Sequence, residues 1–267
     1  MVLILILLSF LLTRLILPLM ASLLTKGDAV RENYVGRKIP IGMGLVTWLV
    51  VTPLLVVYGI LGRDIDYFLF SLILTSTILV GLLDDLLGNH RVKGLKGHML
   101  KLFNDGELTT GALKAITISL FSFLTSWLLT GNFIEVIINF FLLILTTNSF
   151  NLLDLRPGRV IKVYFLLAML LVLLYPASRF FLGVFLASLF SYASWDLKGR
   201  VMLGDAGSNF LGMSIGLVLV TNLGQGSKVI LFFFLAYLHY YTEQKSLSAL
   251  IERYSLLRFI DKLGRQP

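Results

Sequence analysis

The chain has 267 residues, of which 57% are hydrophobic and only 14% are charged, and its formal net charge is +8. A soluble domain is nearer half apolar and a quarter charged, so this composition excludes an ordinary soluble domain and indicates a membrane protein. The absence of cysteine excludes disulfides, thiolate metal sites and thiol catalysis. The basic loops of a membrane protein explain the positive charge more simply than nucleic acid does, so we expect no nucleic-acid partner.

Apolar segments follow one another along the whole chain. They run over residues 2–22, 41–61, 66–83, 111–130, 133–150, 162–175, 180–195, 209–223 and 227–242. They predict a single domain, residues 1–267, with an all-α fold: a polytopic membrane helix bundle of about nine (eight to ten) transmembrane helices. The first segment is interpreted as a membrane helix and not as a cleavable signal, because its first charge is Arg14. The shorter segments 162–175 and 209–223 are expected to be broken or half-buried helices that line a cavity.

The basic residues alternate between the connections that join these segments. Eighteen of the 23 lie after segments one, three, five and seven or in the C-terminal tail: Lys26, Arg31, Arg37, Lys38, Arg91, Lys93, Lys96, Lys101, Arg156, Arg159, Lys162, Lys198, Arg200, Lys245, Arg253, Arg258, Lys262 and Arg265. Because Lys and Arg gather in cytoplasmic loops, this pattern predicts an N-terminus outside and a C-terminus in the cytoplasm. We therefore expect a multi-pass protein of the cytoplasmic membrane, in contact with the lipid bilayer.

Two adjacent carboxylates, Asp84 and Asp85, end the third apolar segment in the run Gly81–Asp85. Their mutual repulsion and their closeness to hydrocarbon both disfavour ionisation, and a bound divalent cation is the usual remedy. A solvated helix end explains the pair equally well. Lys114 follows about one turn into the fourth segment. An intramembrane lysine is a functional hypothesis by default, and snorkelling to the interface is the alternative.

Polar side chains also end the fifth segment. Asn148, Asn151 and Asp154 have i, i+3, i+6 spacing, which predicts one helical face that can bind a nucleotide or a metal. Hydrogen bonding between helices is the alternative. Arg156 and Arg159 follow in a Pro-Gly turn, where a planar guanidinium suits phosphate, although a positive-inside turn explains them as well.

The run Gly204-Asp205-Ala206-Gly207-Ser208 precedes the eighth segment. Its glycines allow close backbone approach, and Ser208 is expected to cap the helix that follows. A helix N-terminus attracts phosphate, and a nearby acid can hold the metal that bridges to it. Three acidic sites on one predicted membrane face favour a metal-dependent phosphate site over three unrelated turns. We expect its metal to lie between Asp205 and either Asp84 or Asp85.

In this order, the runs 81–85, 148–154 and 204–212 resemble the polyprenyl-phosphate N-acetylhexosamine-1-phosphate transferases of glycosyl transferase family 4, which are relatives of phospho-N-acetylmuramoyl-pentapeptide transferase. The first basic loop, from Asp28 through Arg37–Pro40 to Gly44, is also similar to that family's first cytoplasmic loop. The resemblance covers most of the chain. Each motif is weak by itself, but the ordered set is fairly specific.

The resemblance implies transfer of a sugar-1-phosphate, of the N-acetylhexosamine type, from a UDP-sugar to polyprenyl phosphate. The products would be polyprenyl-diphospho-sugar and UMP, in cell-envelope glycan synthesis such as that of peptidoglycan. The cofactor would be Mg²⁺, with Mn²⁺ as the alternative, and the active site would lie on the cytoplasmic face. The implied catalytic residues are Asp84, Asp85 and Asp205, the implied metal ligands are Asp205, Asp84 and Asp154, and the implied substrate-binding residues are Asn148, Asn151, Asp154, Arg156, Arg159 and Lys114. The choice between base and nucleophile, and the question of a homodimer, stay open.

Two features depart from the family pattern. Pro157 stands where Asp-Gly-x-Asp-Gly places the second acid, and we expect Arg156 and Arg159 to contact the donor and replace that acid in part. A single His239 and a basic amphipathic tail replace the histidine-rich final loop that helps to choose the sugar. A catalytically inactive relative that binds polyprenyl phosphate or a membrane partner is therefore the alternative. A transporter fits less well, because transport sites lie near the bilayer midplane.

Overall fold

The computed structural model describes residues 1–88 and 94–265, and most of this part is helical. Arg91 and Lys93, two of the predicted cytoplasmic basic residues, lie outside it, as does the side chain of Lys96. The helices are α1 Val2–Lys26, α2 Gly44–Gly62, α3 Asp66–Leu87, α4 Gly94–Leu100, α5 Thr110–Leu129, α6 Phe133–Leu153, α7 Arg159–Leu174, α8 Arg179–Leu197, α9 Gly204–Asn222, α10 Gln225–Gln244, α11 Leu247–Arg253 and α12 Ser255–Lys262. A π-helical turn, Lys101–Asp105, follows α4, and a 3₁₀ turn, Pro176–Ser178, precedes α8.

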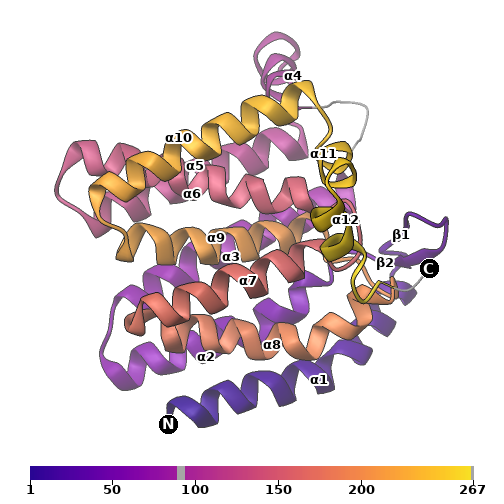
Figure 1. Cartoon of the computed structure of the whole chain (residues 1–267), viewed down its shortest axis with the longest axis horizontal. Helices are drawn as coiled ribbons and strands as arrows, with labels where there is room; N and C mark the ends of the chain where they lie inside the picture. The colour runs from indigo at the N-terminus through magenta and orange to yellow at the C-terminus, as the bar shows by residue number, and fades with distance from the viewer. Residues whose placement is uncertain (89–93, 266–267) are drawn as a thin grey trace.

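Every one of the nine predicted apolar segments forms a helix, so the prediction of an all-α bundle is confirmed. In Figure 1 the long helices lie side by side, with α1 at one edge, α10 at the other, and α3 and α9 between them. Among the described residues, six helices are long and apolar enough to cross a membrane: α1, α2, α3, α5, α6 and α8 with its preceding turn. Helices α7, α9 and α10 correspond to the other three predicted apolar segments.

Helix α9 lies at the centre of the bundle, packed against α3 and α6, and 15 of its 19 residues are buried. A side chain on Gly44 of α2 would place its Cβ only 2.1 Å from the Cα of Gly207, and one on Gly212 would lie 2.7 Å from the Cα of Thr147 in α6. Glycine at these positions therefore lets the backbones touch. Because α9 faces protein on all sides, it does not need the hydropathy of a helix that faces lipid.

Helices α1 and α8 run parallel. The hydroxyl of Ser9 donates to the carbonyl of Val184 at 2.7 Å, and the hydroxyls of Thr13 and Ser188 are 2.8 Å apart. In both pairs the two residues are 175 positions apart in the sequence, so the two helices run in the same direction. The first and seventh predicted segments therefore point the same way, as an alternating topology requires.

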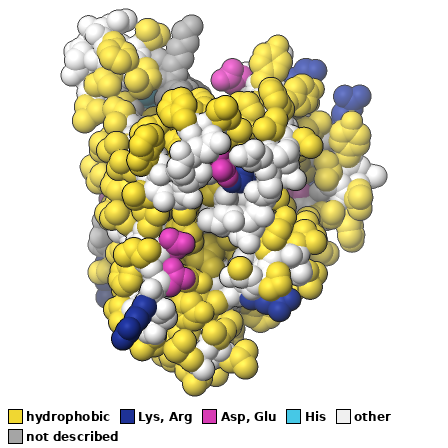
Figure 2. All heavy atoms as spheres, turned by 90° about the vertical axis from the view of Figure 1, so that its left-hand side faces the viewer, with side chains coloured by type: hydrophobic (Ala, Val, Ile, Leu, Met, Phe, Trp, Pro, Cys, Tyr) yellow, Lys and Arg dark blue, Asp and Glu magenta, His cyan; other side chains and the backbone are white. Residues whose placement is uncertain are grey.

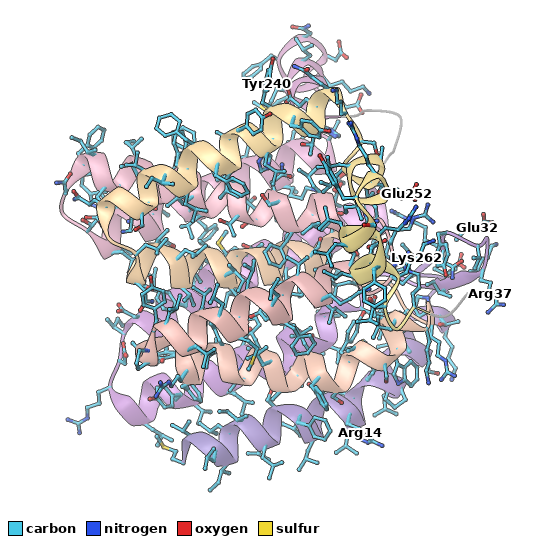
Figure 3. All side chains as sticks on the ribbon, in the orientation of Figure 1. Arg14, Glu32, Arg37, Tyr240, Glu252 and Lys262 are labelled. Atoms are coloured by element: carbon cyan, nitrogen blue, oxygen red, sulfur yellow. The ribbon has the colours of Figure 1, made fainter. Side chains whose placement is uncertain are left out.

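The two ends of the bundle differ in composition. At the end where the chain finishes in Figure 1, α11, α12 and a short hairpin of β1 (Val30–Glu32) and β2 (Lys38–Pro40) cover the ends of the long helices. The strands are antiparallel, with Val30 opposite Pro40. Labelled charged side chains such as Arg37 and Glu252 gather there in Figure 3. The opposite end, in Figure 2, is mostly hydrophobic with few charged side chains.

Candidate active site

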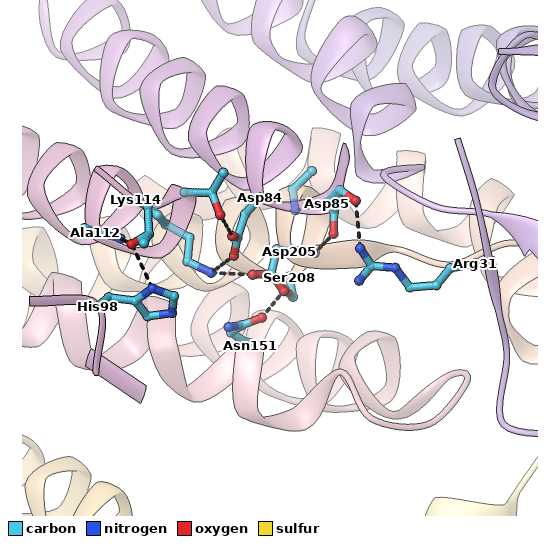
Figure 4. A network of polar contacts seen from close by, with 12 residues as sticks. Arg31, Asp84, Asp85, His98, Ala112, Lys114, Asn151, Asp205 and Ser208 are labelled. Carbon is cyan, nitrogen blue, oxygen red and sulfur yellow. Dashed lines mark hydrogen bonds and ion pairs between the residues drawn. The ribbon is translucent and has the colours of Figure 1, made fainter. Parts of the chain in front are cut away.

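An ammonium group lies between two of the predicted carboxylates. Asp84 is in the last turn of α3, Lys114 is early in α5, and Asp205 opens α9. The Nζ of Lys114 donates to Asp84 Oδ2 at 2.6 Å and also to Asp205 Oδ2, as Figure 4 shows. The hydroxyl of Thr110 donates to the other Asp84 oxygen at 2.6 Å. Since these side chains are 18 to 29% exposed, the Asp84–Lys114–Asp205 group is open at one side.

Asp85 makes different contacts from Asp84 and caps the buried start of α9. Its side-chain oxygens accept from the backbone N–H groups of Asp205 at 2.9 Å and Ala206 at 3.0 Å, and Asp85 is only 6% exposed. A carboxylate at a helix N-terminus satisfies donors that have no partner within the helix. The expectation that Ser208 caps this helix is wrong, because α9 begins at Gly204 and the cap comes from a distant helix.

Gly204 makes this cap sterically feasible. Its φ is +74°, and a Cβ there would lie 2.3 Å from Asp85 Oδ2. Only glycine combines that backbone conformation with room for the carboxylate. The β-hairpin adds a further contact, because the Arg31 guanidinium donates to the backbone carbonyl of Asp85 at 2.8 Å. The first basic loop is thereby joined to the site.

The three polar residues of α6 separate in the structure. Asn151 accepts a hydrogen bond from the Ser208 hydroxyl at 3.2 Å, which joins α6 to α9. Asp154 follows the last residue of α6, whereas Asn148 is exposed on that helix. Because each step of three residues turns a helix by about 300°, two steps place Asn148 and Asp154 roughly 120° apart. The i, i+3, i+6 pattern therefore does not bring all three to one point.

Asp154 faces a small cavity of about 50 Å³, together with an acid that the sequence analysis missed. That acid is Asp196, near the end of α8, which also lines the cavity and accepts a hydrogen bond from the Gly158 N–H at 2.6 Å. Burial raises the pKa of Asp154 well above its ordinary value, and the nearby charges of Asp196, Asp85 and Asp205 raise it further. The sequence did contain a signal for Asp196. Like Asp84, it directly follows the end of an apolar segment.

The two arginines of the Pro-Gly turn have different surroundings. Arg156 lines the cavity beside Asp154, and its guanidinium lies over the Tyr34 ring, 5.4 Å from the centroid. Arg159 is 4% exposed and makes a bidentate pair with Asp261 of α12, at 2.7 and 3.2 Å. Arg156 therefore borders a cavity, whereas both sides of the Arg159 fork are already occupied by Asp261.

Arg159 belongs to a set of contacts that we call the C-terminal clasp, which comprises Arg159, Lys162, Ser248, Asp261 and Arg265. Arg159 also donates to the Ser248 hydroxyl at 3.0 Å, and Arg265 donates to Asp261 at 3.0 Å and to the carbonyl of Pro157 at 3.3 Å. The Lys162 amine donates to the backbone carbonyls that end α12. The clasp therefore docks α11 and α12 onto the start of α7 and onto the turn after Asp154.

The carboxylates at this end suit a hard divalent cation. Among the described residues, no three Asp, Glu or His side chains surround one point as metal ligands. Mg²⁺ does not need three, because it commonly uses one or two carboxylates, several waters and substrate phosphates. Asp84 and Asp205 lie on two sides of one cationic nitrogen, so their oxygens already converge on a positive charge. Their donor chemistry fits Mg²⁺.

Comparison with known proteins agrees with this arrangement. The sequence model of the family described as glycosyl transferase family 4 matches residues 67–223, which run from α3 to the end of α9. The match includes the three acidic motifs and covers more than half of the chain. No curated protein matches the sequence significantly. With helices able to span a membrane and this match across its centre, the chain belongs to glycosyl transferase family 4, a family of transferases.

Proposed function

We propose that this protein transfers a sugar-1-phosphate, of the N-acetylhexosamine type, from a UDP-sugar to polyprenyl phosphate in cell-envelope glycan synthesis. A phosphate oxygen of the lipid would attack the sugar-proximal phosphorus of the donor. The bond from that phosphorus to the oxygen of the uridine-bearing phosphate would break, so UMP leaves and polyprenyl-diphospho-sugar forms. The observation that carries this proposal is the partly exposed Asp84–Lys114–Asp205 group at the end of the bundle where the family's motifs meet.

The charges at this end support the chemistry. Both substrates are anionic, so cations must bring them together. Lys114 is positioned to turn its amine from a carboxylate to an arriving phosphate, while Asp85 holds the start of α9 in place. Magnesium bound by Asp84 and Asp205, with Asp154 nearby, would neutralise diphosphate oxygens. Arg156, which lines the cavity beside Asp154, and Asn151 would contact the donor.

We also propose nine membrane crossings, with the N-terminus outside and this site on the cytoplasmic face of the cytoplasmic membrane. The parallel course of α1 and α8 supports the count, since the first and seventh crossings must run the same way. The alternation of basic residues supports the orientation. Helices α7, α9 and α10 are counted because each packs against another long helix and runs opposite to the long helix before it in the chain.

A catalytically inactive relative is the second candidate, and Pro157 in place of the family's second acid favours it. One assay separates the two. Protein purified in detergent is incubated with polyprenyl phosphate, Mg²⁺ and a panel of radiolabelled UDP-sugars, and label in the lipid fraction is counted with released UMP. We expect one donor to label the lipid, and chelation of the metal to abolish labelling. Binding of polyprenyl phosphate without labelling by any donor would identify the inactive relative.

A further inference from the structure

A second cavity lies on the other side of the end of α8, away from the acidic site. Its volume is about 290 Å³, and it opens to the surface between α1 and α8. Its lining residues are Arg14, Leu17, Pro18, Ser191, Ser194 and Trp195. Trp195 lines this cavity, while the next residue, Asp196, lines the one that contains Asp154. The last turn of α8 therefore separates the two cavities.

Arg14 is the feature that needs an explanation. It is the one charged residue between Val2 and Thr25 in an apolar helix, and it lies on the exposed side of α1, as Figure 3 shows. No ion pair or side-chain hydrogen bond joins it to another residue in the part of the chain that the structure describes. A charged side chain inside the bilayer costs roughly 2.5–3.5 kcal/mol at the helix centre, so it normally has a partner.

The other polar groups of this cavity are also hydrogen-bond donors. The hydroxyl of Ser191 is buried and has no partner within the described residues. Ser194 lies about one turn further along α8, and Trp195, whose indole carries an N–H donor, lines the same cavity. Leu17 and Pro18 form the apolar wall on α1. Several donors around one guanidinium, next to an apolar wall, match a phosphate group that is attached to a hydrocarbon chain.

The depth of the cavity suits a lipid headgroup. Thr13 and Ser188 are paired, so Arg14 lies about level with the residues that follow Ser188. From Ser191 to the end of α8 at Leu197 is six residues, or about 9 Å along the helix axis. A long arginine side chain can extend over much of that distance to the interface. The cavity therefore lies within one leaflet, at the end of the bundle that carries the acidic site.

We propose that this cavity binds the phosphate group of an anionic membrane lipid, with the Arg14 guanidinium as its main contact and the two serine hydroxyls as further donors. The bound lipid would pack against Trp195 and hold the last turn of α8 in place, next to Asp196. The proposal does not depend on the transferase reaction, because none of the acidic residues lines this cavity.

Trp195 can report occupancy directly. The chain has three tryptophans, so the Trp48→Phe, Trp127→Phe double variant leaves Trp195 as the only one. This variant is reconstituted with brominated phosphatidylglycerol or brominated phosphatidylcholine at equal mole fractions, and quenching of tryptophan fluorescence is measured. We expect the anionic lipid to be preferred on the order of tenfold, as charge-assisted hydrogen bonds imply. Equal quenching by the two lipids would overturn the proposal.

Two further variants test the named contact. Arg14→Leu should abolish the preference, whereas Lys26→Gln, which removes a positive charge from the end of the same helix, should preserve it. A preference for the anionic lipid that persists in Arg14→Leu would also contradict the proposal. If Arg14→Leu accumulates poorly in membranes, the Ser191→Ala, Ser194→Ala double variant tests the same cavity and should weaken the preference.

Competition identifies the source of the phosphate. Unbrominated phosphatidylglycerol offers a phosphodiester, and polyprenyl phosphate offers a phosphomonoester. Relief of quenching by either competitor supports the cavity as a lipid-phosphate site, and the more potent one names the natural class. Relief by neither, at mole fractions that match the brominated lipid, contradicts the proposal.

Discussion

Two charged groups at the same end of the bundle are built in opposite ways. In the Asp84–Lys114–Asp205 group, two carboxylates share one lysine, and the side chains are 18 to 29% exposed. In the C-terminal clasp, two arginines share the carboxylate of Asp261, and the side chains of Arg159 and Asp261 are only 4% and 10% exposed. The first group has an excess of acid and an open side. The second is buried, and its charged groups are already hydrogen-bonded to one another.

The difference indicates which group has capacity for a ligand. A closed and hydrogen-bonded pair such as Arg159 and Asp261 contributes to structure, and breaking it leaves an uncompensated charge. A carboxylate pair that shares one cation can still accept a divalent metal or release its lysine to a phosphate. Changes in the open group should therefore act on turnover, and changes in the clasp should act on the position of the tail.

The largest effect is expected at Asp205. Asp205→Asn should reduce turnover at least about 100-fold, because loss of one ligand of the proposed catalytic metal would remove several kcal/mol of transition-state stabilisation. Transfer of labelled sugar to polyprenyl phosphate measures it. Glu252→Gln, which removes an exposed acid from α11, is the matched control and should keep full activity. Wild-type turnover in Asp205→Asn would place the chemistry elsewhere.

The Asp85 cap should be sensitive to a single methyl group. Gly204→Ala adds a Cβ at 2.3 Å from Asp85 Oδ2 to the strain of a φ of +74°. Gly199→Ala has similar backbone strain, at a φ of +59°, but its nearest contact is a side-chain nitrogen at 3.4 Å. We expect Gly204→Ala to lower the free energy of unfolding by about 3 kcal/mol and Gly199→Ala to lower it by about 1 kcal/mol. Thermal unfolding in detergent compares them, and equal losses would mean that the cap has little role in stability.

The two arginines should separate on replacement by lysine, which keeps the charge and loses the fork. Arg156→Lys should weaken binding of the UDP-sugar by about 3- to 10-fold. Arg159→Lys should leave donor affinity nearly unchanged and loosen the clasp. Titration with the UDP-sugar measures the first effect, and hydrogen exchange of α11 and α12 measures the second. Equal loss of donor affinity in both variants would show that Arg159 leaves Asp261 to contact the donor.

The smallest effect is expected when the pH is lowered. Burial alone would raise the pKa of Asp261, but the hydrogen bond and charge of Arg159 and the charge of Arg265 lower it below its ordinary value. Because the folded pKa lies below the unfolded one, the clasp keeps its full contribution above about pH 4 and loses it as the pH falls through the folded pKa. Protection of α12 amides, corrected for intrinsic exchange rates, should stay level from pH 7 to about pH 5. Since Asp196 lies near Lys162 and Arg265, the same measurement is made in Asp196→Asn, and a loss within that range that persists in this variant would contradict the assignment.

The sequence by itself predicted the long helices of this protein. Long apolar segments must form helices in lipid, because the backbone finds no other hydrogen-bond partner there, and each predicted segment is a helix. The acids at the ends of three segments were expected on one face, and Asp84, Asp85, Asp154 and Asp205 do lie near one another. These features depend on local composition and on the alternating direction of successive helices, both of which can be read from the sequence.

Only the tertiary structure decided which side chains meet. The Asp85 cap on α9 joins residues 120 positions apart, and Asp196 reaches the cavity of Asp154 from a different helix. Asn148 shares the Asn-rich motif and is nevertheless exposed, while Arg159 is taken by Asp261, 102 residues away. Such contacts depend on how far each helix is rotated and how closely it approaches its neighbours. Close contacts at Gly44, Gly207 and Gly212 determine that packing. The pattern of residues within one segment does not predict it.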